Sequence, residues 1–435
     1  MYYKRKIDND LLAWKDESRR KPLLLRGARQ VGKSTAVREL SKHFEYFVEI
    51  NFDDFKEIHK LFEGNLFPKE ICRNISGFVD IPIIPGKTLL FFDEIQACIP
   101  AISSLRYFYE NYPELHLIAA GSLLEFALEE LPSYGVGRIR SMFVYPFSFN
   151  EFVAAKGDTI FLEQKINTSP EKPWHEVIHN KAINTLKQYL IIGGLPEVVA
   201  TYIETNDYLQ SQAVLDDLIL SFRVDFTKYK NRVPSTRISE VFKAIVDQQG
   251  SKFVYKNIDS QANHAQLKEA VELLIMAGLV IPVTHSSANG IPLGAQIDSK
   301  KRKLLIFDTG IFQRLLGLKI SDLLIENEFN LINKGCIAEL FVGLEIYKSG
   351  SSYTTKDLYY WHREVPKSNA EVDYLIQKEE EIIPIEVKSG SKGSMQSMYV
   401  FLNEKKLNKG IRTSLENYGK IDKVEIWPLY AVSEI

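Results

Sequence analysis

A glycine-rich segment near the N-terminus carries residue types that bind phosphate. Residues 27–34 read Gly-Ala-Arg-Gln-Val-Gly-Lys-Ser, which fits the spacing G-x-x-x-x-G-K-[ST]. Glycine lets the backbone curl tightly, so that successive N–H groups can point at phosphate oxygens. Lys33 would neutralise the β- and γ-phosphates, and the Ser34 hydroxyl would ligate Mg²⁺. The residues expected around the phosphates are Gly27, Ala28, Arg29, Gln30, Val31, Gly32, Lys33, Ser34 and Thr35.

Two carboxylates follow an apolar run downstream of this loop. Thr88–Phe92 has the composition of a buried strand, and Asp93 and Glu94 come directly after it. In an open parallel sheet, side chains at the carboxyl ends of strands gather in one crevice, so these carboxylates would lie beside the phosphate loop. Asp93 would hold Mg²⁺, usually through water, and Glu94 would orient and deprotonate an attacking water. Together the two motifs predict ATP binding and hydrolysis, with ATP and Mg²⁺ at the site.

Two further polar residues lie where they could act on the same reaction. Ser122 follows the strand-like run Leu117–Ala120 and could contact the γ-phosphate or the lytic water as a sensor. It could equally be the N-cap of a helix over Leu123–Leu131, and both roles can hold together. Arg138 could stabilise transition-state charge on a neighbouring subunit's ATP, with Arg140 in reserve. The alternative for Arg138 is a solvated or structural arginine.

Carboxylates and a lysine recur near the C-terminus. Glu371 and Asp373 are two residues apart in one predicted strand and therefore share a face, as do Glu386 and Lys388 at the end of the next. If the strands pair, Asp373, Glu386 and Lys388 converge in an arrangement that resembles the PD-(D/E)XK nuclease fold. The carboxylates, with Glu339 as a further ligand, could then hold Mg²⁺ beside a scissile phosphate, and Lys388 could position the water. The alternative is an ordinary polar strand face, or a degenerate fold kept for binding.

The composition bounds the kind of protein. With 435 residues the chain should form several domains, and its net charge of -2 does not by itself attract nucleic acid. Three widely spaced cysteines argue against a zinc site and a disulfide framework: Cys72, Cys98 and Cys336. The sequence shows no signal-peptide pattern and no apolar run long enough to cross a bilayer. We therefore expect a soluble, cytoplasmic protein without a membrane partner.

The elements that must position these residues alternate at first between strands and helices. Such alternation predicts a parallel sheet with crossover helices, with strands at Leu23–Arg26, Phe47–Phe52, Leu89–Phe92 and Leu115–Ala120. Residues from Phe149 to Tyr229 are mainly helical.

The C-terminal half reads as mixed α/β. Two helices, Ile238–Gln248 and Ala265–Ala277, precede a hairpin turned by Asn289-Gly290, which suits a winged helix-turn-helix. The basic run Lys300-Lys301-Arg302-Lys303 could meet a phosphate backbone, or could be a solvated loop. The last region begins with a helix, and the elements predicted there are Lys334–Lys348, Leu358–Trp361, Glu371–Gln377, Ile382–Val387 and Val424–Pro428.

These motifs together resemble the AAA+ ATPases, and in particular a prokaryotic family that joins an AAA-type domain to an uncharacterised C-terminal region. The likeness rests on residues 28–34, 92–96 and 120–122, and continues through 137–138, 145–149, 193–197, 308–310, 371–373 and 385–388. It implies an α/β fold with an AAA-like P-loop core over residues 1–150 and a helical lid over 151–232. It further implies a winged-helix-like module over 233–322 and a restriction-endonuclease-like domain over 323–435.

Two functions are compatible with this reading. The first is a Mg²⁺-dependent ATPase, a hydrolase associated with DNA or RNA through its C-terminal half. The second is a signalling or regulatory NTPase that switches protein partners and uses a dead nuclease-like domain for docking. Either could form homo-oligomers.

Overall fold

The structure, a computed structural model, describes residues 2–131, 135, 137–229, 233–318, 335–363, 365, 369–388 and 395–435. It divides into two compact units. Unit 1 contains the chain up to Tyr145 together with Met276–Gly278 and Ser351–Thr355, and unit 2 contains Pro146–Ile275, Leu279–Gly350 and Lys356–Ile435. The run Pro146-Phe147-Ser148-Phe149, placed in the core by the expected boundary at residue 150, therefore belongs to unit 2.

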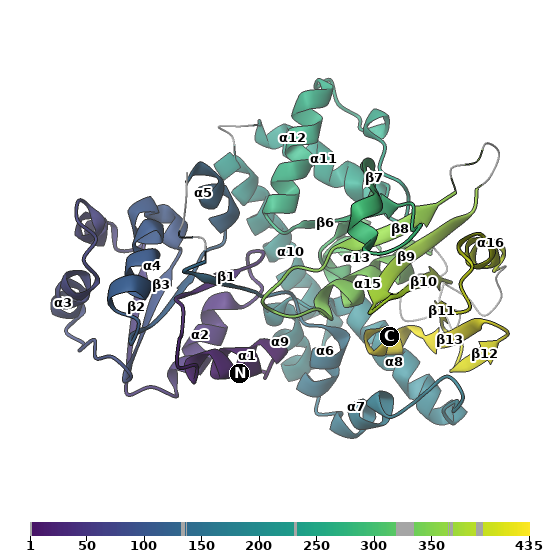
Figure 1. The fold of residues 1–435 in the computed structure, drawn as a ribbon, viewed down its shortest axis with the longest axis horizontal. Coiled ribbons are helices and arrows are strands. Elements are labelled where there is room, and N and C mark those ends of the chain that lie inside the picture. The colour runs from purple at the N-terminus through teal and green to yellow at the C-terminus, as the bar shows by residue number, and fades with distance from the viewer. Residues whose placement is uncertain are drawn as a thin grey trace. The chain divides into compact units, whose positions relative to one another are not determined.

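Unit 1 is built on a parallel sheet. Its strands are β1 (Leu23–Arg26), β2 (Tyr46–Asn51), β3 (Thr88–Asp93), β4 (His116–Ala120) and β5 (Arg140–Phe143), in the order β2-β3-β4-β1-β5. Its helices are α1 (Lys6–Lys15), α2 (Lys33–Ser41), α3 (Pro68–Val79), α4 (Ile99–Asn111) and α5 (Leu124–Glu130). Figure 1 shows α3 and α4 on one side of this sheet and α1 and α2 on the other. The predicted α/β core is thus what the chain forms here.

The strand β3 has a continuous apolar run, Leu89–Phe92, because both faces of the sheet are covered. All six of its residues are buried, as are the five of β4. Parallel sheets protected on both faces read as continuous apolar runs rather than alternating ones. The strand β4 lies between β1 and β3, so the ends of these three strands meet at one edge of the sheet. That edge receives the phosphate loop after β1, the carboxylates after β3 and Ser122 after β4.

Unit 2 begins with the helices expected between Phe149 and Tyr229. They are α6 (Phe149–Ala155), α7 (Thr159–Ile166), α8 (Glu176–Ile192), α9 (Pro196–Thr205) and α10 (Tyr208–Asp225). The helices that follow are α11 (Ser235–Asp247), α12 (His264–Met276, whose last residue groups with unit 1), α13 (Thr309–Leu315), α15 (Cys336–Lys348) and α16 (Gln396–Lys405). Among the described residues, no helix is long and apolar enough to span a membrane.

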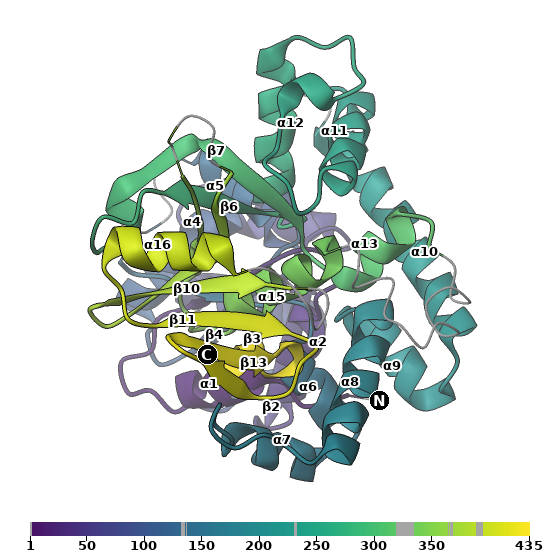
Figure 2. The same cartoon turned by 90° about the vertical axis from the view of Figure 1, so that its right-hand side faces the viewer.

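A mixed sheet runs through the rest of unit 2. Its strands are β6 (Val280–Ser286), β7 (Ile297–Ile306), β8 (Leu358–His362), β9 (Glu371–Lys378), β10 (Glu381–Val387), β11 (Gly410–Ser414), β12 (Gly419–Ile421) and β13 (Val424–Pro428). Their order is β12-β13-β11-β10-β9-β8-β6-β7. Phe401 of α16 packs against Trp361, Val372 and Leu375 of these strands, and Figure 2 shows α16 alongside them. Because β6 pairs with β8, the strands after the two helices and the C-terminal strands form one sheet.

The connection between β6 and β7 differs from the prediction. A hairpin turned by Asn289-Gly290 would need strands that end beside these two residues, but β6 ends at Ser286 and β7 begins at Ile297. The intervening loop is held by side chains. The Ser286 hydroxyl donates to the carbonyl of Leu293 at 2.9 Å, and Gln296 Oε1 accepts from the amide of Asn289 at 2.7 Å. β6 and β7 do pair antiparallel, so the predicted hairpin is confirmed, but its turn is a longer loop that these hydrogen bonds stabilise rather than Asn289-Gly290 alone.

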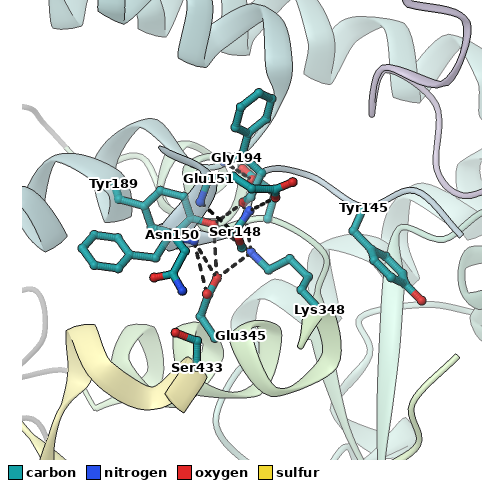
Figure 3. A network of polar contacts seen from close by, with 12 residues as sticks. Tyr145, Ser148, Asn150, Glu151, Tyr189, Gly194, Glu345, Lys348 and Ser433 are labelled. Carbon is teal, nitrogen blue, oxygen red and sulfur yellow. Dashed lines mark hydrogen bonds and ion pairs between the residues drawn. The ribbon is translucent and has the colours of Figure 1, made fainter. Parts of the chain in front are cut away.

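Several motifs that carried the resemblance hold unit 2 together. The Asp308 carboxylate accepts hydrogen bonds from the amides of Gly194 (2.7 Å) and Ile311 (3.0 Å). A Cβ at Gly193 would lie 2.2 Å from an Asp308 oxygen, so the glycine leaves room for this carboxylate. Figure 3 shows a second network, in which Glu345 and Lys348 of α15 meet the start of α6 and Tyr189 of α8. The motif residues therefore stabilise the packing within unit 2.

Candidate functional site

The phosphate loop between β1 and α2 has the tight curl that its glycines predict. Gly27 has a φ of 137°, and a Cβ at this position would lie 2.1 Å from the carbonyl oxygen of Val144. Gln30 and Gly32 also have positive φ angles, of 64° and 90°, and Gly32 is the residue before the first turn of α2. Positive φ favours glycine, and a side chain at residue 27 would also collide with backbone. A loop with this curl that leads into the N-terminus of α2 can present backbone N–H groups to a phosphate.

Lys33 is buried and folded over its own loop. Its Nζ donates to the carbonyl oxygens of Gly27 at 2.9 Å and Ala28 at 2.7 Å, and the residue is 8% exposed. Burial lowers the pKa of Lys33 to about 8, although Glu94 and Asp93 act in the opposite direction. An incoming phosphate would offer this ammonium group a full negative charge in place of two carbonyl dipoles.

This pKa predicts how nucleotide affinity should change with pH. Only the protonated form of Lys33 attracts phosphate, and with a pKa of about 8 its protonated fraction falls as the pH rises above that value. We expect the Kd for ATP to increase about fivefold between pH 8 and pH 9, a range in which the triphosphate no longer titrates. Titration calorimetry across this range would measure the change. A constant Kd would show that Lys33 remains protonated in the nucleotide-free protein.

The remaining loop residues are placed around this lysine. Arg5, at the start of α1, donates to the carbonyl oxygen of Val31 at 2.9 Å and to that of Tyr145 at 2.7 Å. This buried arginine stabilises the loop, and no sequence motif indicated that role. Arg29 is partly exposed, and Thr35 is exposed on the first turn of α2.

Ser34 and Asp93 meet directly. The Ser34 hydroxyl donates to Asp93 Oδ2 at 2.8 Å, and the backbone N–H of Glu94 donates to Asp93 Oδ1 at 3.0 Å. Burial raises the pKa of Asp93, while the hydrogen bond from Ser34 opposes this change. Two hard oxygen donors at the edge of a phosphate loop suit Mg²⁺, which takes one or two protein ligands and completes its shell with water and phosphate.

Glu94 accepts hydrogen bonds from Ser122, which follows the neighbouring strand β4. Its Oε2 accepts hydrogen bonds from the Ser122 hydroxyl at 3.0 Å, from the Ser122 amide at 3.3 Å and from Gln96 Nε2 at 2.5 Å. The structure therefore brings Ser122 to Glu94, while Gln96 is an additional contact that the sequence analysis did not assign. The helix α5 begins at Leu124 with Leu123 before it, so the N-cap alternative for Ser122 was wrong.

The two arginines considered for transition-state charge are both paired within unit 1. Arg138 forms an ion pair with Glu110 of α4, and its side chain is 49% exposed. Arg140 pairs with Glu17 and lies over the ring of Tyr353, 5.4 Å from its centroid. Among the described residues, neither arginine donates a hydrogen bond to Asp93 or Glu94. A role toward a neighbouring subunit's nucleotide stays a prediction.

In unit 2, the predicted carboxylates and lysine do converge. Glu386 and Lys388 form an ion pair at 2.6 Å, and Asp373 Oδ2 accepts from the amide of Val387 at 2.8 Å. A residue from outside the predicted set joins them, because Lys303 Nζ lies 2.8 Å from Glu339 Oε1 and 3.7 Å from Asp373 Oδ1. Lys303 also contacts Glu371.

The predicted basic run is largely neutralised by the chain itself. Lys303 is buried among carboxylates, Arg302 pairs with Glu272 of α12 at 2.8 Å, and Lys301 pairs with Asp298 at 3.3 Å. Lys300 is exposed. The reading of Lys303 as part of a phosphate-binding face was therefore wrong, because β7 turns this side chain toward the interior and the carboxylates there compensate its charge.

Comparison with known proteins bears on each part of the chain. Residues 19–153 match the family model of an AAA domain. This AAA domain contains the phosphate loop, the carboxylates after β3 and the serine after β4. Residues 183–322 and 334–432 match two further families, each described as a domain of unknown function (DUF8612 and DUF4143). No curated protein matches the chain.

Two solved structures are similar to the chain at low identity. One is the Walker-type ATPase paby2304 of Pyrococcus abyssi, with 16% identity and a TM-score of 0.46, covering 72% of this chain and 96% of that one. The other is the Aeropyrum pernix ORC1 protein in complex with DNA, with 12% identity and a TM-score of 0.29, covering 76% of this chain and 94% of that one.

The AAA domain therefore has a P-loop site whose parts come from three adjacent strands. Its chemistry is that of nucleotide binding, with oxygen donors for a divalent ion and a carboxylate beside them. Among the described residues, no group of three or more His, Cys, Asp or Glu side chains is arranged to hold a metal ion. For the AAA domain this is compatible with Mg²⁺, because the phosphates of a nucleotide would supply the missing ligands.

Proposed function

We propose that the AAA domain binds ATP with Mg²⁺ and hydrolyses it to drive a conformational change. The observation that carries this proposal is the hydrogen bond between Ser34 and Asp93, which are next in sequence to Lys33 and Glu94. A loop for phosphates and a strand end for a metal ion are thereby joined at one place. This combination is what phosphoryl transfer needs, because its catalysis rests on positioning and charge stabilisation.

Each residue has a separate role in this proposal. Lys33 leaves the carbonyl oxygens of its own loop and binds the β- and γ-phosphates. Ser34 and Asp93 hold Mg²⁺, which supplies charge neutralisation at the phosphates. The backbone N–H groups of the loop and the N-terminus of α2 bind the remaining phosphate oxygens.

Glu94 is the proposed base for the attacking water. Three donors now stabilise its carboxylate, two from Ser122 and one from Gln96. All three donate to Oε2, whereas Oε1 accepts no hydrogen bond among the described residues and could take the proton from water. Ser122, which orients this carboxylate, would link the γ-phosphate to Glu94, which is the sensor role expected from the sequence.

The replacement Lys33→Ala tests the proposed nucleotide site. We expect it to raise the Kd for ATP at least about a hundredfold, because a hydrogen bond from a charged donor to phosphate is lost in a buried position. Equilibrium binding of a fluorescent ATP analogue would measure this effect. Lys42→Ala is a matched control, since Lys42 follows α2 and its side chain is 66% exposed. Equal affinity in both variants would contradict the proposal.

Nucleic-acid association is the first candidate for what the ATPase acts on. It is supported by the sequence pattern of two helices followed by strands, and by the exposed Lys300. The second candidate, a regulatory NTPase that switches protein partners, is favoured by one observation. The ion pairs of Arg302 and Lys301 reduce the positive charge available to a phosphate backbone.

A single assay separates these candidates. ATP turnover is measured with DNA, with RNA and without either, and nucleic-acid integrity is scored in the same tubes with Mg²⁺ or Mn²⁺. Nucleic-acid association predicts turnover that rises with DNA or RNA at low salt and loses this rise as salt increases. Turnover unaffected by either polymer, together with no binding at low salt, would favour the regulatory NTPase.

A further inference from the structure

The carboxylate cluster of unit 2 is built around an ammonium group. Lys303 Nζ contacts one carboxylate from α15 and two from β9, belonging to Glu339, Glu371 and Asp373. In the nuclease arrangement that this segment resembles, such carboxylates hold a divalent metal. Here the chain supplies a cation of its own to the same oxygens.

Burial and charge make this ammonium a permanent part of the cluster. The Lys303 side chain is 1% exposed, and that of Glu339 is 10% exposed. Three carboxylates contact the Lys303 ammonium group, so its buried positive charge is compensated by the chain itself. A buried charge of this kind is stable when it is paired and hydrogen-bonded.

The backbone fixes Lys303 in this position. Lys303 pairs with Val283 of β6 on one side of β7 and forms a bridge with Lys252 on the other. Its Nζ also lies 5.3 Å from the centroid of the Tyr360 ring on β8. The pairing on both sides of β7 fixes where the Lys303 side chain leaves the backbone, so its ammonium group stays within reach of the carboxylates.

The carboxylate oxygens already serve an ammonium group. The 2.8 Å distance from Nζ to Glu339 Oε1 is an ordinary charge-assisted hydrogen bond. A Mg²⁺ ion at the same oxygens would lie beside the positive charge of Lys303, which repels it. The second lysine of the cluster, Lys388, already pairs with Glu386 at 2.6 Å. The residues present therefore do not fit the metal that the resemblance implies.

We propose that the nuclease-like centre of this chain is a lysine-filled site, in which the Lys303 ammonium takes the place of the divalent metal. The domain then requires no metal for its fold and cleaves no phosphodiester. Its carboxylates stabilise the join between β7, α15 and β9. The ATPase proposal is independent of this one, because the AAA domain contributes no residue to the cluster.

The test measures Mn²⁺ binding to nucleotide-free protein by the loss of the free-ion signal in electron paramagnetic resonance. Wild type is compared with Asp373→Asn, and we expect the two to bind the same amount of Mn²⁺. Lys303→Met, which keeps the side-chain length without the charge, should gain one Mn²⁺ that the double variant Lys303→Met/Asp373→Asn lacks. Lys300→Met, an exposed position on the same strand, should bind as wild type does.

Three results would overturn the proposal or decide it without Lys303→Met. A wild-type Mn²⁺ site that disappears in Asp373→Asn would overturn the proposal, as would metal-dependent cleavage of DNA or RNA that the same substitution abolishes. If Lys303→Met fails to fold, the comparison of wild type with Asp373→Asn still decides. A folded Lys303→Met without the additional Mn²⁺ would show that the cluster is no cation site, which also overturns the proposal.

Discussion

Glu94→Gln should lower the kcat for ATP hydrolysis by about 10²–10⁴-fold, the usual contribution of general-base catalysis. The amide retains the size of the carboxylate and can still accept hydrogen bonds from Ser122, but it cannot take a proton from water. Lys33, Ser34 and Asp93 are unchanged, so the Kd for ATP should remain within about threefold of wild type. The protein should then retain intact ATP, which would be measured by separating bound nucleotide after gel filtration.

A matched control distinguishes loss of the base from a general disturbance of the AAA domain. Glu63 is exposed in the same unit, and Glu63→Gln should leave kcat and Kd unchanged. Turnover of Glu94→Gln close to wild type would remove Glu94 from the role of base. A large increase in the Kd for ATP in Glu94→Gln would instead indicate that this carboxylate organises the loop rather than the water.

The geometry of the candidate nucleotide site could be predicted from sequence because its determinants are local. A glycine-rich turn specifies its own backbone conformation, and an apolar strand specifies where its final carboxylate emerges. The contact between Ser122 and Glu94 follows from one further rule, that neighbouring parallel strands end at the same edge. Arg5 and Gln96 could not be found in this way, because the direction of a polar side chain depends on packing that no short motif encodes.

The limits of the prediction in unit 2 have a different cause. The strand Val424–Pro428 was predicted with the bounds that the structure has, and its buried residues alternate as in a half-covered strand. Lys303 was misread because four basic residues in a row suggest a solvated segment. Its partners are 36 or more residues away in the sequence, so nothing local identifies them. The sequence contained one weak signal that Lys303 is buried, because the apolar run Leu304–Ile306 follows it directly. In the structure, β7 is buried from Lys303 onward.

The motif residues of unit 2 show why a resemblance can extend over a chain without marking catalytic groups. Gly193 and Asp308 lie far apart in the sequence and touch in the fold, and so do Phe149 and Glu345. In the first pair a glycine leaves room for the buried Asp308 carboxylate. In the second pair the Phe149 amide donates to the buried Glu345 carboxylate. Such contacts tolerate little substitution because an unpaired buried carboxylate is costly. The second pair permits a direct test.

Glu345→Ala should lower the free energy of unfolding of unit 2 by about 3–5 kcal/mol, the usual cost of breaking a buried ion pair. The side chains of Glu345 and Lys348 are 1% and 5% exposed, and their charged groups are 2.8 Å apart. The substitution would also leave the amide of Phe149 without its acceptor, while Lys348 would keep the Tyr189 hydroxyl at 2.7 Å and the Phe147 carbonyl oxygen (Figure 3).

Urea unfolding followed by tryptophan fluorescence would report this loss. Trp174, Trp361 and Trp427 belong to unit 2, whereas Trp14 belongs to unit 1, so the signal is dominated by the unit that contains the ion pair. Glu380→Ala, at an exposed position in the same unit, should change the midpoint little. Glu345→Gln should fall between the two, since it retains an acceptor for Phe149 but not the negative charge. Equal midpoints for Glu345→Ala and Glu380→Ala would mean that the ion pair contributes no more to stability than an exposed glutamate does.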